Sequence, residues 1–164
     1  MKGFKTDFFK SLLFVTVMTA TTLFGICGCF RGEKKTITSV EAMTLTLQGM
    51  RGTSVYELAE ADGVTELRLY REIYSDGNVT LKLEKSAVCD RASFIELMND
   101  CGVIRWDGFH GKHPKNVLNG IMFNLTATVN GGETVEADGS ANFPNGYNTF
   151  VRALGAILAE GDNK

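Results

Sequence analysis

The sequence predicts an α+β domain, in which an antiparallel sheet of about five to six strands carries two helices packed on one face. Several segments alternate apolar and polar residues with a period of two, which is typical of half-buried strands. Short glycine-containing turns separate these segments, and two later segments carry apolar stripes at helical spacing. Strands joined by tight turns must be antiparallel, because parallel neighbours need long crossover connections.

The first four strands are expected at about 43–47, 55–58, 64–69 and 79–83. Met43, Leu45 and Leu47 alternate with threonines, which predicts one buried side. Asp-Gly pairs at 62–63 and 76–77 each separate two alternating runs, and this arrangement predicts hairpins. Val79, Leu81 and Leu83 continue the alternation after the second pair. The other face carries Thr, Glu, Arg and Lys, which is typical of a solvated surface.

A helix is expected from about residue 90 to residue 101. Asp90 suits the N-cap and Gly102 the position after the end. The apolar side chains recur at i, i+3, i+4 and i+7, namely at Phe94, Leu97, Met98 and Cys101.

The second half of the chain predicts a loop, two more strands and a second helix. The loop covers about 107–119, and alternating residues from 121 to 129 continue past a turn at 130–132. The last helix follows Pro144 and ends before Gly161. Its apolar stripe consists of Tyr147, Phe150, Val151, Leu154, Ile157 and Leu158.

Cys89 and Cys101 allow two interpretations. In an exported protein a pair of cysteines suggests a disulfide. The intervening helix would separate their Cα atoms by ~18 Å, whereas a disulfide requires about 7 Å or less. We therefore favour two free thiols, with Cys101 on the apolar face of the helix.

The amino terminus has the pattern of a secretory signal. Lys2, Lys5 and Lys10 precede an almost uncharged stretch from Leu12 to Ile26. This stretch is shorter than the ~20 apolar residues of a spanning helix. The alternative is an uncleaved amino-terminal anchor, and both interpretations predict export.

Ile26-Cys27-Gly28-Cys29 follows directly after the apolar stretch and resembles the lipobox of bacterial lipoproteins. The resemblance implies cleavage before Cys29 and attachment of diacylglycerol to its sulfur, with acylation of the new amino terminus. Two or three acyl chains hold a protein durably at a bilayer, at ~0.8 kcal/mol per buried CH₂. We therefore expect a signal peptide at 1–28, a lipidated tether at 29–36 and a single domain at 37–160, on the extracytoplasmic side of the cell membrane.

Composition narrows the range of partners. The whole chain has a formal net charge of −2, and removal of the lysine-rich signal makes the remainder more acidic. Nucleic-acid binding requires clustered Lys and Arg, so nucleic acid is not an expected partner. No residue pattern predicts a cofactor.

The carboxy-terminal half carries a pattern of its own, in Trp106-Asp107-Gly108-Phe109, Val117-Leu118-Asn119-Gly120 and residues 137–147, Ala-Asp-Gly-Ser-Ala-Asn-Phe-Pro-Asn-Gly-Tyr. It resembles a recurring domain of bacterial lipoproteins and secreted proteins that has no established activity. Asn119 replaces a usual acidic residue, and Ala141 interrupts a usual Ser-Asn. The resemblance implies an antiparallel sheet with helices and names no catalytic residue.

Most of this pattern is expected to be architectural, with Trp106 and Phe109 as core anchors and Asp107-Gly108 in a turn. The alternative is a shallow groove between the 107–119 loop and the 138–146 corner. Its candidate binding surface comprises Trp106, Asp107, Phe109, His110, Asn142, Phe143 and Tyr147.

Candidate chemistry is limited to a few side chains. His110 and His113 are three residues apart and could share a metal, but Gly111 and Pro114 favour a loop and a catalytic zinc needs a third ligand. Cys89 beside a histidine could act as a nucleophile only with an exposed thiol of lowered pKa. No Gly-x-Ser-x-Gly or phosphate-binding loop occurs.

Three functions follow as hypotheses. The first is a lipid-anchored, non-catalytic domain that binds an envelope protein, a peptide or a cell-wall fragment. The second is an envelope metal-binding protein or hydrolase that uses His110 and His113. The third is a purely structural or inhibitory module.

Overall fold

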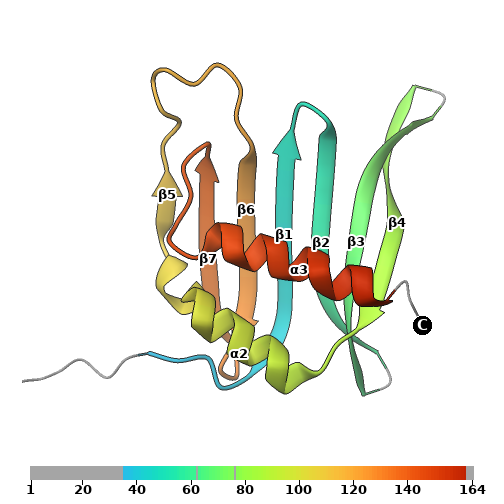
Figure 1. The fold of residues 1–164 in the computed structure, drawn as a ribbon, viewed down its shortest axis with the longest axis vertical. Helices are drawn as coiled ribbons and strands as arrows, with labels where there is room; N and C mark the ends of the chain where they lie inside the picture. Colours follow the sequence, from blue (N-terminus) through green and yellow to red (C-terminus); the bar gives the residue numbers. More distant parts are fainter. Residues whose placement is uncertain (1–34, 62, 76, 162–164) are drawn as a thin grey trace, which may run out of the picture. The chain divides into compact units, whose positions relative to one another are not determined.

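The computed structural model describes residues 35–61, 63–75 and 77–161 (Figure 1). The predicted signal peptide and the lipidation site Cys29 lie outside these residues. Four strands come first: β1 (Val40–Gly49), β2 (Gly52–Ala61), β3 (Val64–Ser75) and β4 (Asn78–Val88). Helix α2 (Arg91–Cys101) and the 3₁₀ helix η1 (Val103–Trp106) follow. The chain continues through β5 (Phe109–Gly111), β6 (Met122–Val129) and β7 (Glu133–Ser140) to helix α3 (Tyr147–Gly161).

Within the described part of the chain, seven strands form one mixed sheet in the order β4-β3-β2-β1-β6-β7-β5. All neighbours are antiparallel except β5, which pairs with β7 in parallel. The α+β class is confirmed, whereas the expected five to six antiparallel strands are too few. The additional strand is β5, whose three residues lie in the segment that was expected to be a loop.

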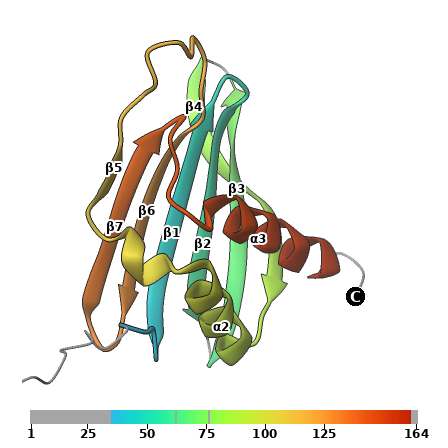
Figure 2. The ribbon, with the colours of Figure 1, turned by 60° about the vertical axis from the view of Figure 1, so that its left-hand side comes forward.

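Both helices lie on one face of the sheet, as predicted (Figures 1 and 2). Alternate strand residues are buried beneath them, including Leu45, Leu67 and Leu125. Phe150, Leu154 and Leu158 recur every four residues along α3 and are buried as well. The core therefore lies between this face of the sheet and the two helices. No described helix is both long and apolar enough to cross a membrane.

Helix α2 begins and ends where the sequence predicts. The Asp90 carboxylate accepts hydrogen bonds from the backbone N–H and the hydroxyl of Ser93, both at 2.8 Å. Gly102 adopts a left-handed conformation at φ 70° and donates its N–H to Asn99. Cys89 precedes this helix and Cys101 is its last residue, and both are free thiols, which confirms the favoured interpretation.

A β-bulge in β4 decides which face its apolar residues occupy. Leu69 of β3 pairs with Lys85, but the next residue, Tyr70, pairs with Leu83, so Glu84 is one extra residue in β4. Beyond this point Val79, Leu81 and Leu83 pair with residues of β3 that point away from the helices. Their side chains are 46–56% exposed. The open face therefore carries an apolar strip as well as the expected polar residues.

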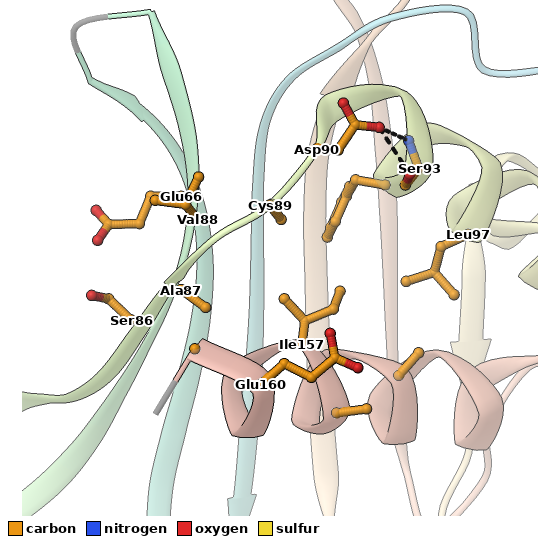
Figure 3. A pocket seen from close by; sticks show the side chains of 14 residues that line it. Glu66, Ser86, Ala87, Val88, Cys89, Asp90, Ser93, Leu97, Ile157 and Glu160 are labelled. Carbon is orange, nitrogen blue, oxygen red and sulfur yellow. Dashed lines mark hydrogen bonds between the residues drawn. The ribbon is translucent and has the colours of Figure 1, made fainter. Parts of the chain in front are cut away.

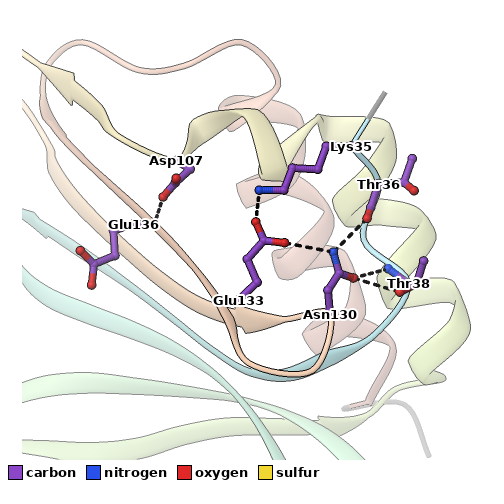
Figure 4. Close-up of polar contacts among 7 residues, drawn as sticks. All are labelled: Lys35, Thr36, Thr38, Asp107, Asn130, Glu133 and Glu136. Carbon is purple, nitrogen blue, oxygen red and sulfur yellow. Dashed lines mark hydrogen bonds and ion pairs between the residues drawn. The ribbon is translucent and has the colours of Figure 1, made fainter. Parts of the chain in front are cut away.

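The chain enters the domain along the turn between β6 and β7 (Figure 4). We call residues 35–39 the entry segment. The Asn130 side chain accepts a hydrogen bond from the Thr38 N–H at 2.7 Å and donates one to the Thr36 carbonyl at 3.0 Å. Lys35 forms an ion pair with Glu133. Lys35 and Thr36, which were assigned to the tether, thus contact the domain directly.

Candidate functional site

Backbone pairing joins part of the 107–119 loop to β7, at the start of the 138–146 corner, where the sequence predicts a shallow groove. Phe109, His110 and Gly111 of β5 pair with Ala137, Asp138 and Gly139 of β7. At both glycines an added Cβ would lie only 2.3–2.4 Å from the Asn142 carbonyl oxygen. These glycines are required because the corner folds directly against the two strands. The two segments therefore pack directly against each other at these residues.

The aromatic residues of the predicted binding surface belong mainly to the core. Trp106 and Tyr147 are 2% and 5% exposed, so neither can contact a partner. The Trp106 indole N–H donates to the Asn145 carbonyl at 2.9 Å. Phe143 is half-buried and stacks on Tyr147 with ring centroids 4.4 Å apart. Trp106 is a core anchor as predicted. Phe109 is half-buried and packs against the core.

The remaining residues of this surface are exposed and serve local structure. The Asp107 carboxylate accepts a hydrogen bond from the Glu136 N–H at 3.1 Å (Figure 4). Asn142 donates to the Lys112 carbonyl at 3.4 Å. His110 forms a pair with Asp138 on the neighbouring strand.

The two histidines face different partners. His113 Nε2 lies 2.5 Å from the Val117 carbonyl oxygen, so this nitrogen donates a hydrogen bond. In the neutral imidazole, Nδ1 then accepts from the Ser140 hydroxyl, which lies 2.8 Å away. His110 is held by Asp138 instead. Across the described residues, no group of three or more His, Cys, Asp or Glu side chains is arranged to hold a metal ion.

The structure contains a first hollow, the helix groove, between α2, α3 and the end of β4 (Figure 3). It has a volume of about 700 Å³ and is lined by apolar residues such as Phe94, Leu97 and Ile157. Cys89 also lines it, and burial raises the pKa of this thiol. A raised pKa keeps the thiol protonated, which is the opposite of what a nucleophile needs.

The acidic residues of the helix groove are largely committed to neighbouring groups. The Glu66 carboxylate has a lowered pKa because it accepts a hydrogen bond from Ser86, and it also pairs with Arg68. Asp90 caps α2. The Glu66 and Asp90 carboxylates around this hollow are therefore already bonded to neighbouring groups of the domain.

A second hollow of about 540 Å³, the loop-end cleft, lies where β1 turns into β2. Its floor includes Leu47 and Tyr56, which point to the helix side of the sheet. Arg51 and Arg71 are its charged residues, and Asn119 and Ile121 close it from the long loop. Burial raises the pKa of Tyr56, Arg71 opposes this increase, and Glu84 adds to it.

The same end of the sheet gathers exposed apolar side chains. We define the loop end as the β1–β2 turn, the end of β3 with the start of β4, and residues 112–122. In Figure 1 this is the upper end, opposite the entry segment. Leu118 is 97% exposed, Met50 85% and Tyr74 74%. Val117, Ile121 and Met122 add to this surface.

Sequence reasoning missed the loop-end residues because they belong to three segments far apart in the chain. A signal was present, since Val117 and Leu118 are large apolar residues in the expected 107–119 loop, and Met50 lies between two expected strands. Turns are ordinarily polar and solvated, so an apolar turn indicates a contact surface. Only the strand directions in the folded sheet bring the three segments to one end.

Comparison with known proteins adds no relative. No protein-family model matches the sequence, and no curated protein matches it significantly.

Proposed function

We propose that this chain is a lipid-anchored, non-catalytic domain on the extracytoplasmic side of the cell membrane, and that it binds its partner through the loop end. The observation that carries the proposal is the group of exposed apolar side chains there, which includes Met50 and Leu118. Exposed apolar side chains that gather at one end of a small domain favour an interaction site there. An envelope protein, a peptide or a cell-wall fragment remains the expected partner class.

The position of the entry segment supports this proposal. A lipid on Cys29 would connect to the domain through Lys35, which pairs with Glu133 at the end of the sheet opposite the long loop. The strands separate the two ends. An anchor at one end leaves the other accessible.

The anchor is tested by replacing Cys29 with Ser in the full chain. Labelling with a radioactive fatty acid should disappear and an uncut precursor should accumulate. A Cys27→Ser variant is the matched control and should be labelled normally. Persistent labelling of the Cys29→Ser protein would show that the lipid is attached elsewhere.

The binding face is tested by photo-crosslinking in intact cells. A photoreactive residue at position 118 should yield a discrete adduct with an envelope component. The same residue at position 88, where Val88 is 73% exposed at the other end of β4, is the control. Adducts at position 88 but not at position 118 would contradict the proposal.

The hydrolase hypothesis is favoured by one observation, the hydrogen bond from the Ser140 hydroxyl to His113 Nδ1. A serine that donates to an oriented imidazole is the first requirement of a nucleophilic serine. Here a neutral carbonyl orients the ring, in place of a carboxylate. A fluorophosphonate probe should label wild-type protein but not a Ser140→Ala variant if this second function holds. Absence of labelling in both would remove it.

A further inference from the structure

The loop-end cleft combines an apolar floor with positive charge. Leu47 is half-buried on its floor, and Met50 and Ile121 are exposed beside it. Arg51 and Arg71 are its charged lining residues, with no carboxylate among the side chains that line it. Its volume of about 540 Å³ is within the range of small-molecule sites.

The two guanidinium groups differ in their ion pairing. Arg71 pairs with Glu84, the bulge residue, and both side chains are about half exposed. Arg51 is exposed and makes no ion pair with another described residue. Among the lining side chains, Arg51 therefore stays uncompensated after the Arg71–Glu84 pair is counted. The Glu72 carboxylate, which lies beside Gly52, accepts a hydrogen bond from the Thr53 N–H at 2.7 Å.

Polar groups in the cleft suit a small anionic head. Guanidinium groups bind carboxylates through paired hydrogen bonds. The Tyr56 side chain is half-buried on the floor, on the same face of the sheet as Arg71. A phenolic hydroxyl at such a position can donate a further hydrogen bond to an anion.

We infer that the loop-end cleft binds a small amphipathic carboxylate, with the carboxylate at Arg51, Arg71 and Tyr56 and the apolar part against Leu47, Met50 and Ile121. This inference rests on the proposed function, because it assigns a ligand class to the same end of the molecule. The charge of the cleft favours an anion over a cation of the same shape.

The inference is tested with three probes that share a body and differ in the head group. The full-length protein is placed in nanodiscs of neutral phosphatidylcholine, and binding is measured by equilibrium dialysis with empty nanodiscs subtracted. The probes are 4-phenylbutyrate, 4-phenylbutylamine and 4-phenylbutanol. Saturable binding is expected for the carboxylate, with weaker binding of the alcohol and the weakest binding of the amine. Equal binding of all three, or no saturable binding of the carboxylate, would overturn the inference.

Two variants locate the bound anion. Arg51→Glu should weaken binding of 4-phenylbutyrate by about tenfold or more, and Tyr56→Phe should weaken it to a smaller extent. Arg152→Glu reverses the charge of an exposed arginine on α3 and is the matched control. If Arg152→Glu weakened binding of 4-phenylbutyrate equally, the loss would come from the net charge of the protein, and the inference would fail. All variants are first compared with wild type by thermal melting.

Failure of this inference and failure of the proposed function give different results. Crosslinking at position 118 without carboxylate binding would reject the ligand class and leave the binding face standing. Carboxylate binding without any crosslink at position 118 would support the cleft and reject a macromolecular partner at the loop end.

Discussion

Gly146 lies where the chain enters α3 and touches the end of α2. Its φ is +87°, and an added Cβ would lie 2.2 Å from the Cys101 carbonyl oxygen. Backbone, and not a flexible side chain, occupies the space. A glycine at this position therefore allows the start of α3 to approach the backbone at the end of α2.

Replacing Gly146 with Ala should destabilise the protein by about 2–4 kcal/mol, because the clash and the left-handed backbone add together. Gly155→Ala is the matched control, since Gly155 is an exposed residue inside α3 with no atom near the added Cβ. That change should stabilise the protein by about 0.5–1 kcal/mol. Chemical denaturation measures both. Equal effects of the two changes would contradict this description of Gly146.

Asp90 couples the start of α2 to pH. The hydrogen bonds from the Ser93 backbone and side chain lower the pKa of its carboxyl below the ordinary value of 3.8. A carboxyl whose pKa is lower in the folded state contributes stability above its unfolded pKa. That contribution disappears as the pH falls through the folded pKa.

Asp90→Ala should therefore lower the melting temperature at pH 7, and its difference from wild type should shrink as the pH falls below 3.8. Asp90→Asn keeps a capping oxygen without a charge, so its melting temperature should fall less at pH 7 than that of the alanine variant. Circular dichroism melts across this pH range provide the measurement. A difference between the alanine variant and wild type that does not change with pH would count against a charged cap.

At the scale of elements, β4 shows how one inserted residue redirects a strand. The extra residue Glu84 leaves Val79, Leu81 and Leu83 on the open face of the sheet. Without it, the same alternation would direct them toward the helix side, because a slip of one residue exchanges the faces of a strand. The bulge also places Glu84 beside Arg71.

Leu81→Thr should change the free energy of unfolding by no more than about 0.5 kcal/mol, since this side chain is 53% exposed. Leu67→Ala, one strand away in the core, should cost about 2–5 kcal/mol. Denaturant unfolding of both variants distinguishes the two environments. A large loss in the Leu81→Thr protein would mean that the apolar strip of β4 is covered.

The sequence predicted those elements whose signals are local. Asp90 and Gly102 mark the ends of α2, and the apolar stripe marks α3, so both helices were found. Strand β5 was missed because its three residues are held by pairing with β7, and no local pattern encodes that partner. The bulge was missed because alternation continues unbroken through residues 79–83 while the pairing shifts at Glu84.

The candidate site was less predictable than the fold. Trp106 and Tyr147 are large aromatics in the motif that resembles a domain of bacterial lipoproteins, and the sequence alone could not separate a core role from a contact role. Both side chains are buried in the structure, so both belong to the core. Arg51, Tyr56 and Arg71 meet only after three strands have paired, so no spacing in the sequence reports their proximity.

At the scale of the whole molecule, the entry segment is fastened to the sheet through Asn130. This residue has a φ of +51° and bonds to both Thr36 and Thr38. Those contacts join the start of the described chain to the β6–β7 turn. Hydrogen bonds from Asn130 therefore hold the entry segment against the domain.

Asn130→Gly should release the entry segment while tolerating the left-handed backbone, at a cost of about 1–2 kcal/mol for the lost hydrogen bonds. Amide exchange of Thr38 should accelerate, and exchange in β3 should stay as in wild type. Native-state hydrogen exchange with mass spectrometry measures both regions. Unchanged protection of Thr38 would show that the segment is held by other contacts.

The direction of the strands has a mechanical consequence. Tension that enters at Lys35 and leaves through a partner at the opposite end would run along the length of β1. The backbone bonds that join β1 to β2 and β6 would then resist sliding together, in shear, and would not peel apart one after another. With the proposed anchor and partner in place, a domain loaded in this way would resist extension between its two attachment points.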